Sequence, residues 1–244
     1  MNTTLIVTPT VNERENLPRM VQRLLSLPVK VDLLVVDGNS SDGTGQIADE
    51  LAAKHPEIHV LHEKKKNGLG RAYIAGFKWA LEQGYEFIFE MDCDFSHNPD
   101  DIPLLLEAAQ TADLAIGSRY IGGIRIINWP LSRLMLSKGA AAYVKIITGM
   151  PITDPTGGYK CFRRRALEAL DLDAVRSNGY SFQIELTHSL WRQGYRVTEV
   201  PIIFTERVQG HSKMSGNIVS EALVMVWRLF FQNGCRRKPQ PRSK

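Results

Sequence analysis

The sequence predicts an α/β fold with a mostly parallel central sheet and helices on both of its faces. Short apolar runs alternate with segments of helical periodicity from the N-terminus to about residue 120. These runs end in turn-forming residues, which is typical of buried parallel strands. Alternating strands and helices indicate a layered sheet, and such sheets bind their ligands beyond the carboxyl ends of the strands.

Three strand and helix pairs are predicted first. Leucine and valine recur at helical spacing after the first strand, turn and capping residues at 37–44 follow the second strand, and small residues mark one side of the third helix. The strands are expected at 5–7, 31–36 and 58–61, and the helices at 15–27, 47–52 and 68–81.

The second half of the chain departs from this rhythm. Apolar runs at 87–91 and 114–117 predict two further strands, and the segment 154–160 is interpreted as a loop because it is rich in Gly, Pro, Asp and Thr. Helices are expected at 131–148, 164–170, 182–192 and 217–232, and a last strand at 196–204.

Two aspartates separated by one residue, Asp92 and Asp94, follow the apolar run that begins at Phe87. Alternation along an extended backbone places both carboxylates on one side. Carboxylates this close repel each other unless a cation lies between them, and Mg²⁺ or Mn²⁺ binds oxygen ligands of this kind together with substrate phosphates. A simple turn is the alternative, with Asp94 or Ser96 capping a helix that begins at Pro99.

The position of the aspartates favours a function. Polar loops follow four of the predicted strands, at 9–13, 37–44, 92–96 and 118–119. Because the carboxyl ends of parallel strands meet at one edge of a sheet, these loops are expected to line one crevice.

Composition places the protein among ordinary globular chains. The 244 residues are 43% hydrophobic and 23% charged, which allows one sizeable core, and the net charge of +4 permits an anionic partner. Three widely spaced cysteines suggest neither a disulfide framework nor a zinc site, and hence a reducing compartment. A strand within a few residues of Met1 leaves no room for a signal peptide, and no apolar run reaches the roughly 18 residues of a transmembrane helix.

Neither of two common nucleotide-binding motifs is present. The sequence has no G-x-G-x-x-G after its first strand and no P-loop. Nucleotide phosphates would therefore have to be held by a metal ion and by basic side chains, which fits Asp92 and Asp94 with Arg119, Arg207 and Lys213.

From about Thr4 to Asn217 the chain resembles the family 2 glycosyltransferases of GT-A fold. The loops at 9–13, 37–44 and 92–94 are similar to the donor, nucleoside and metal motifs common to many sugar transferases. Five further runs, in this order, resemble the dolichyl- or polyprenyl-phosphate mannose synthases: 117–120, 128–139, 154–158, 179–183 and 207–213.

The resemblance implies roles for individual residues. Asp92 and Asp94 would act in catalysis together with Arg119, and Asp92, Asp94 and Ser96 would hold the metal ion. Arg119, Arg133 and Ser137 would bind the acceptor phosphate. The donor would be bound by Pro9, Val11, Glu13, Val36, Asp37, Gly38, Asp92, Cys93, Asp94, Arg207 and Lys213.

The implied reaction transfers mannose from GDP-mannose to a polyprenyl phosphate with Mg²⁺ or Mn²⁺ and inverts the anomeric centre, giving a β-linked product. The family usually has Tyr where this chain has Val11 and Asp where it has Gly38. Both departures lie in the implied nucleoside pocket, so UDP-glucose or another sugar nucleotide is an alternative donor. A catalytically silent subunit that binds nucleotide or lipid is the rival from another functional class.

Two interpretations of the C-terminal segment 217–244 remain open. Its apolar residues exceed a narrow stripe and are followed by five basic residues, as in helices that lie at membrane surfaces. A helix docked on the catalytic domain, 1–216, or at a dimer interface is the alternative. We expect a cytoplasmic protein that contacts the cytoplasmic membrane face directly or through a membrane partner, and no nucleic acid.

Overall fold

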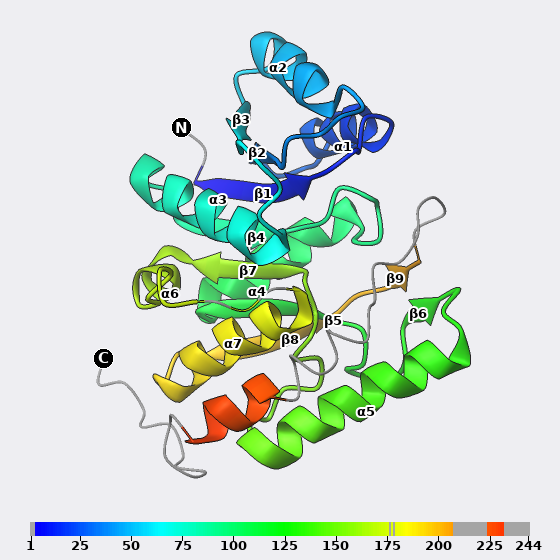
Figure 1. Cartoon of the computed structure of the whole chain (residues 1–244), viewed down its shortest axis with the longest axis vertical. Helices are drawn as coiled ribbons and strands as arrows, with labels where there is room; N and C mark the ends of the chain where they lie inside the picture. Colours follow the sequence, from blue (N-terminus) through cyan, green and yellow to red (C-terminus); the bar gives the residue numbers. More distant parts are fainter. Residues whose placement is uncertain (1–2, 176, 178, 207–223, 232–244) are drawn as a thin grey trace.

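A computed structural model describes residues 3–175, 177, 179–206 and 224–231 (Figure 1). Its centre is a seven-stranded sheet in the order β3-β2-β1-β4-β7-β5-β8. All neighbouring strands run parallel except at β7, which is antiparallel to both β4 and β5. The strands are β1 (Thr4–Thr10), β2 (Asp32–Asp37), β3 (Ile58–His62), β4 (Phe87–Glu90), β5 (Leu114–Ser118), β7 (Lys160–Arg163) and β8 (Val197–Pro201).

Helices cover both faces of the sheet, as predicted. Successive residues of β1 alternate between two buried clusters, with Leu5 and Val7 in one and Ile6 in the other. The cluster of Ile6 includes α1 (Asn16–Leu25), α2 (Thr44–Lys54) and α4 (Ile102–Thr111), which follows the short 3₁₀ turn η1 (Pro99–Asp101). The other cluster includes α3 (Leu69–Gln83), α6 (Arg164–Glu168), α7 (Gly179–Arg192) and part of α5 (Leu131–Thr148).

The small residues of α3 let this helix lie close to the sheet. A Cβ atom on Gly76 would come within 2.3 Å of Val7 Cγ1, so only glycine allows this approach. The helix thereby brings Tyr73 over the end of β4, where its hydroxyl reaches Asp92. Packing of α3 thus supports the loop that carries the paired aspartates.

Three sequence-based predictions were wrong in detail. Lys160 was assigned to a loop but begins β7, a short strand whose buried lysine breaks the apolar pattern. The strand expected at 196–204 is two strands, β8 and β9 (Phe204–Thr205), and β9 pairs with β6 (Ile126–Ile127) in a separate small sheet. The turn before α4 is capped by Asn98, whose side chain accepts a hydrogen bond from the Asp100 N–H, and not by Asp94 or Ser96.

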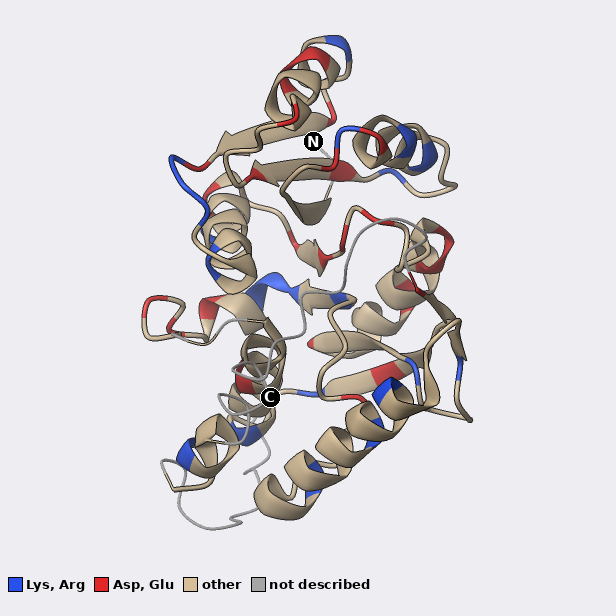
Figure 2. Cartoon of the chain, turned by 45° about the vertical axis from the view of Figure 1, so that its right-hand side comes forward, with Lys and Arg blue, Asp and Glu red and all other residues tan. Residues whose placement is uncertain are grey.

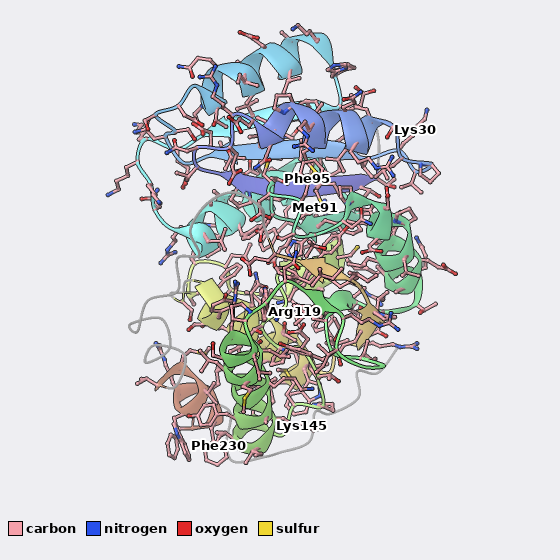
Figure 3. The ribbon with its side chains drawn as sticks, turned by 90° about the vertical axis from the view of Figure 1, so that its right-hand side faces the viewer. Lys30, Met91, Phe95, Arg119, Lys145 and Phe230 are labelled. Carbon is pink, nitrogen blue, oxygen red and sulfur yellow. The ribbon has the colours of Figure 1, made fainter. Side chains whose placement is uncertain are left out.

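The predicted final helix lies partly outside the described residues. Residues 224–231 are helical and lie next to α5, at the end of the molecule opposite α1 and α2 (Figures 1 and 3). Met225, Val226 and Leu229 are buried in the same cluster as α3 and α7. This part of the segment therefore packs on the domain with one face.

Candidate functional site

A cleft with a volume of about 440 Å³ lies at the carboxyl ends of the parallel strands. It brings together loops that follow β1, β2, β4 and β5, which agrees with the predicted crevice. Most of the predicted site residues line it: Pro9, Val11, Glu13, Val36, Gly38, Asp92, Cys93, Asp94, Ser96, Arg119 and Arg133. Asp37 and Ser137 do not line it, and Arg207 and Lys213 lie outside the described residues.

The loop that carries Asp92 and Asp94 is held by internal hydrogen bonds. The strand ends at Glu90, so the two aspartates stand in the loop and not on extended backbone. The Tyr73 hydroxyl donates to Asp92 Oδ1 at 3.3 Å, and the Ser96 N–H donates to Asp94 Oδ1 at 3.0 Å. Both carboxylates therefore have a defined orientation in the cleft wall.

Phe95 turns this loop sharply. Its φ of 59° is in the left-handed region, which an aromatic side chain rarely adopts. The Arg19 guanidinium lies 5.3 Å from the centre of the Phe95 ring and packs against it. Because such a conformation persists only where its surroundings hold it, the loop is a built feature of the site.

The donor set suits a hard divalent cation. Asp92, Asp94 and the buried Ser96 offer oxygen ligands, and Mg²⁺ commonly takes one or two carboxylates together with substrate phosphates. Within the part of the chain that the structure describes, no cluster of three or more His, Cys, Asp or Glu side chains is arranged to hold a metal. The residues present therefore fit a metal ion that substrate phosphates help to coordinate.

His97 is a buried residue behind the aspartate loop. It is 3% exposed, stacks on Tyr159 and accepts a hydrogen bond at Nδ1 from the Asp92 N–H at 3.2 Å. Burial lowers its pKa, so the ring is neutral at pH 7. His97 thus acts as a rigid support behind the aspartate loop.

The two residues that depart from the family pattern, Val11 and Gly38, are neighbours in space. A Cβ atom on Gly38 would lie 2.9 Å from Val11 Cγ2 and 3.4 Å from the Thr10 carbonyl oxygen. A side chain at position 38 therefore requires Val11 to move. The family's Tyr and Asp are therefore both replaced by smaller residues at two positions in contact, and the two replacements together change the shape of this end of the cleft.

Asp37 holds the loop that follows β2 through hydrogen bonds. It is buried and accepts hydrogen bonds from the Ser40 hydroxyl at 2.5 Å and the Ser40 N–H at 3.3 Å. His62 Nδ1 lies 3.7 Å from Asp37 Oδ2. In this structure Asp37 holds the loop at Ser40, and its contact with the donor stays a prediction.

Arg119 and Asp154 form a buried ion pair beneath the cleft. Arg119 donates from Nε to Asp154 Oδ2 at 2.7 Å and from Nη2 to Oδ1 at 2.6 Å, and its own N–H donates to Oδ2 at 3.0 Å. Burial alone would raise the pKa of Asp154, but the guanidinium and these hydrogen bonds hold the pKa below its ordinary value. Asp154 is thus the counterion of Arg119.

Arg133 projects from α5 into the cleft beside an aromatic wall. Its guanidinium lies 4.2 Å from the centre of the Trp129 ring and pairs with Glu206. Phe204 meets Trp129 edge to face and adds to the same wall. Both arginines are paired with a carboxylate, but the Arg133 side chain is less buried than that of Arg119, so Arg133 is the better placed of the two to meet a second anion.

Ser137 lies one turn along α5 and accepts a hydrogen bond from the Tyr120 hydroxyl at 2.6 Å. This contact ties α5 to the loop after β5. A direct contact of Ser137 with acceptor phosphate remains a prediction that requires the Tyr120 bond to be shared.

Several cleft residues were missed by sequence reasoning. Glu63, Lys66 and Asn67 at the nucleoside end belong to a charged segment without a motif, so no signal singled them out. Tyr180 and Gln183 belonged to a recognised run, but the run gave no role to either side chain. Their position could be found only when α7 was placed against the sheet.

Comparison with known proteins agrees with this geometry. The model of glycosyl transferase family 2 matches residues 5–171. An undecaprenyl-phosphate mannosyltransferase of Micrococcus luteus is 52% identical over 224 residues, which cover 92% of each chain. A polyprenol monophosphomannose synthase of Mycolicibacterium smegmatis is also 52% identical, over 91% of this chain and 85% of the relative.

A solved structure supports the fold. The mannosyltransferase PcManGT of Pyrobaculum calidifontis, in complex with GDP-Man and Mn²⁺, superposes with a TM-score of 0.61 at 17% identity, over 97% of this chain and 66% of that one. The GT-A fold expected from sequence is confirmed. With a family match over most of the sheet and relatives that share half of its residues, the chain belongs to glycosyl transferase family 2 and is an enzyme.

Proposed function

We propose that this protein transfers mannose from GDP-mannose to a polyprenyl phosphate and inverts the anomeric centre. One observation carries the proposal: a single cleft contains the paired carboxylates Asp92 and Asp94 as well as the cationic Arg133 beside Trp129. Two phosphate-bearing substrates can therefore meet there. The names of the relatives from Micrococcus luteus and Mycolicibacterium smegmatis support mannose as the sugar and a polyprenyl phosphate as the acceptor.

The reaction needs no general base. A phosphate monoester carries roughly −1.5 to −2 charge at neutral pH, so an ionised oxygen can attack the anomeric carbon directly. The bond from that carbon to the diphosphate breaks, and its electron pair leaves with GDP. The buried His97, which accepts a backbone hydrogen bond, agrees with a site that moves no proton.

The chain's own residues orient the two anions. Asp92 and Asp94, with Ser96, would hold Mg²⁺ or Mn²⁺ at the donor diphosphate, and a divalent cation bound there supplies charge that stabilises the departing GDP. Arg207 and Lys213, both outside the described residues, are proposed to close over the same diphosphate. Arg119, held in place by its ion pair with Asp154, would contribute positive charge on the acceptor side of the cleft.

The proposal is tested by incubating the protein with labelled GDP-mannose, UDP-glucose and related donors, short polyprenyl phosphates and Mg²⁺ or Mn²⁺. We expect a polyprenyl phosphate mannose, identified by mass and by its β linkage. A glucose product from UDP-glucose would favour the alternative donor. No product from any donor, with no metal-dependent thermal stabilisation by GDP or UDP, would favour a silent subunit.

Replacing Arg133 with Ala is expected to raise the KM for polyprenyl phosphate roughly 10- to 100-fold, the usual effect of losing a charge-assisted hydrogen bond. The KM for GDP-mannose is expected to change less than about twofold, because Arg133 lies on the acceptor side of the cleft. Arg23→Ala, an exposed arginine on α1 outside the cleft, is the matched control. Equal increases for both substrates would contradict an acceptor role of Arg133.

We also propose that the outer face of α5 and the segment 217–244 contact a membrane surface. The helix α5 contains Arg133, Lys138 and Lys145 and no acidic residue (Figure 2). Leu131 and Met135 are 70% and 67% exposed on it, and Phe231 of the neighbouring helix is 70% exposed. Exposed apolar residues beside cations fit an anionic bilayer, where a polyprenyl phosphate would be found.

Among the described helices, none is long and apolar enough to cross a membrane. In Figure 3, Arg119 lies above α5, while Lys145 lies toward the far end of α5 and Phe230 lies beside that helix. The cleft and the proposed contact face thus share one helix, since Arg133 of α5 lines the cleft.

The combined variant Leu131→Gln, Met135→Gln is expected to reduce binding to vesicles that contain anionic phospholipid at least roughly fivefold, because polar side chains lose the burial of apolar surface. Flotation of protein with vesicles measures the effect, and Leu104→Gln, an exposed leucine on α4, is the control. If the α5 variant floats as well as the wild type, this face does not bind membrane. If the wild type is a dimer and the variant a monomer, the face is a subunit interface.

A further inference from the structure

A fully buried lysine lies directly behind the cleft. Lys160 is 0% exposed, and its Nζ donates to the Gln183 backbone carbonyl at 2.9 Å and to Gln183 Oε1 at 2.5 Å. It faces Glu90 across the antiparallel pair of β4 and β7. Lysine is almost never fully buried without a paired group, so this arrangement has a structural purpose.

Burial and the pairing partner change the titration of both charged groups. Burial lowers the pKa of Lys160 to about 8, and burial raises the pKa of Glu90 to about 7. Glu90 and Asp154 oppose the lowering because they stabilise the ammonium form of Lys160, and one of the two contacts of its Nζ is a backbone carbonyl, which can only accept a hydrogen bond. A protonated Lys160 can donate three hydrogen bonds and accept none.

The lysine therefore determines which way the Gln183 carboxamide points. Because Lys160 only donates, the end of the carboxamide that it contacts must be the oxygen, however similar N and O appear. The Nε2 amide is then presented at the opposite end, where it lies 3.6 Å from the position of a Cβ on Gly158. The Gln183 side chain also hydrogen-bonds toward Glu90, which lowers the pKa of that carboxyl. Because a carboxamide has two N–H donors, one can serve Glu90 while the other remains for a ligand in the cleft.

The space next to this amide is part of the cleft. Gly158 and His97 both line the cleft, and His97 Cε1 lies 3.7 Å from the same Cβ position. A side chain at position 158 would fill this gap. His97 also accepts a hydrogen bond from the Asp92 N–H. Only the His97 ring therefore separates the Gln183 amide from the aspartate loop. A hexose linked to a diphosphate at Asp92 and Asp94 would occupy the part of the cleft next to this loop, where Gln183 also lines the wall.

We propose that Gln183 binds the hexose of the donor, with its Nε2 donating a hydrogen bond to a sugar hydroxyl, and that Lys160 is the positioning residue that keeps the amide in this orientation. The proposal rests on the proposed function and adds to it a residue that contacts the sugar. It explains why a lysine is buried where an apolar side chain would pack at lower energetic cost.

The test compares the affinity of a sugar nucleotide with that of its nucleoside diphosphate, because only the former contains the hexose. Titrations use GDP-mannose against GDP and UDP-glucose against UDP, each with Mn²⁺. Gln183→Met removes both polar ends of the side chain, whereas Gln183→Glu keeps an acceptor for Lys160 but offers no N–H. Gln193→Met, an exposed glutamine just beyond α7, is the matched control.

Both Gln183 variants are expected to weaken the sugar nucleotide roughly tenfold relative to its nucleoside diphosphate, as expected for one lost hydrogen bond. A carboxylate at position 183 also repels the diphosphate, but this effect cancels in the ratio. Lys160→Met is expected to change the same ratio a few-fold, since the carboxamide can then rotate, and a change in stability alone would leave the ratio unaltered. An unchanged ratio in both Gln183 variants overturns the inference.

Failure of the proposed function gives a different result. If UDP-glucose is the donor, the mannose assignment fails, and the ratio for UDP-glucose against UDP still decides the role of Gln183. If the wild type binds none of these nucleotides, both proposals are wrong. If wild type and variants transfer mannose with equal affinity ratios, only the role of Gln183 is wrong.

Discussion

Replacing Asp94 with Asn is expected to lower the transfer rate by roughly 10³-fold or more while leaving the fold intact. Asp94 lines the cleft with its Oδ1 held by the Ser96 N–H, and we propose that its carboxylate helps to hold the divalent cation. Metal stabilisation of a leaving group contributes several kcal/mol, and each 1.36 kcal/mol changes the rate tenfold. Asparagine keeps the shape of the side chain but removes its charge.

Product formation and metal-dependent thermal stabilisation by GDP measure this effect together. In the wild type, GDP with Mn²⁺ is expected to raise the Tm more than GDP alone, and Asp94→Asn is expected to lose that difference. Asp100→Asn, an exposed aspartate paired with Arg23 outside the cleft, is the matched control. Substantial transfer by Asp94→Asn with metal present would sink the metal assignment.

Replacing Asp154 with Asn is expected to destabilise the protein by about 3–5 kcal/mol, because it leaves the guanidinium of Arg119 buried without a counterion. For a chain of this size, the Tm would fall by roughly 10 °C. Urea denaturation of wild type, Asp154→Asn, Arg119→Leu and the double variant Arg119→Leu, Asp154→Leu measures the loss. The double variant should be more stable than either single variant, because each single variant leaves one buried charge without its partner and the double variant leaves none. A double variant no more stable than the single ones would argue against a buried ion pair.

The ion pair of Arg119 and Asp154 is expected to make the free energy of unfolding depend on pH, with a sign that follows from the pKa of Asp154. The pKa of Asp154 is lowered in the folded protein, so its contribution to stability is present above the unfolded value of about 3.9. That contribution is lost as the pH falls through the folded pKa. The difference in unfolding free energy between wild type and Asp154→Asn should therefore be largest near neutral pH and narrow below about pH 4. A constant difference down to pH 2 would contradict a lowered pKa.

Local pattern was sufficient for most of the architecture. Parallel strands buried on both faces require continuous apolar runs, and amphipathic helices require a periodic apolar face, so β1 to β5, α1 to α3 and α5 were predicted close to their observed bounds. The helix α4 appeared only in the alternative interpretation, as a helix beginning at Pro99. The strand β7 was missed because it is short and begins with Lys160, a residue whose burial depends on partners far away in sequence. The division between β8 and β9 was missed for a similar reason, since β9 is defined by its pairing with β6.

At the site, too, sequence predicted some features and only the tertiary structure determined others; Asp92 and Asp94 belong to the first group. Their spacing after a buried strand, and the polar loops at the ends of neighbouring strands, predicted that they would lie in a cleft, because chain direction in a parallel sheet determines where its loops gather. The family resemblance implied that Arg119 binds the acceptor phosphate, and it gave no partner for this arginine. Only the tertiary structure pairs these two residues, and only it joins Lys160 to Gln183, since each contact crosses more than 20 residues of chain and depends on how β7 and α7 pack against the sheet. Burial makes these contacts strong, and burial is a property of the assembled fold.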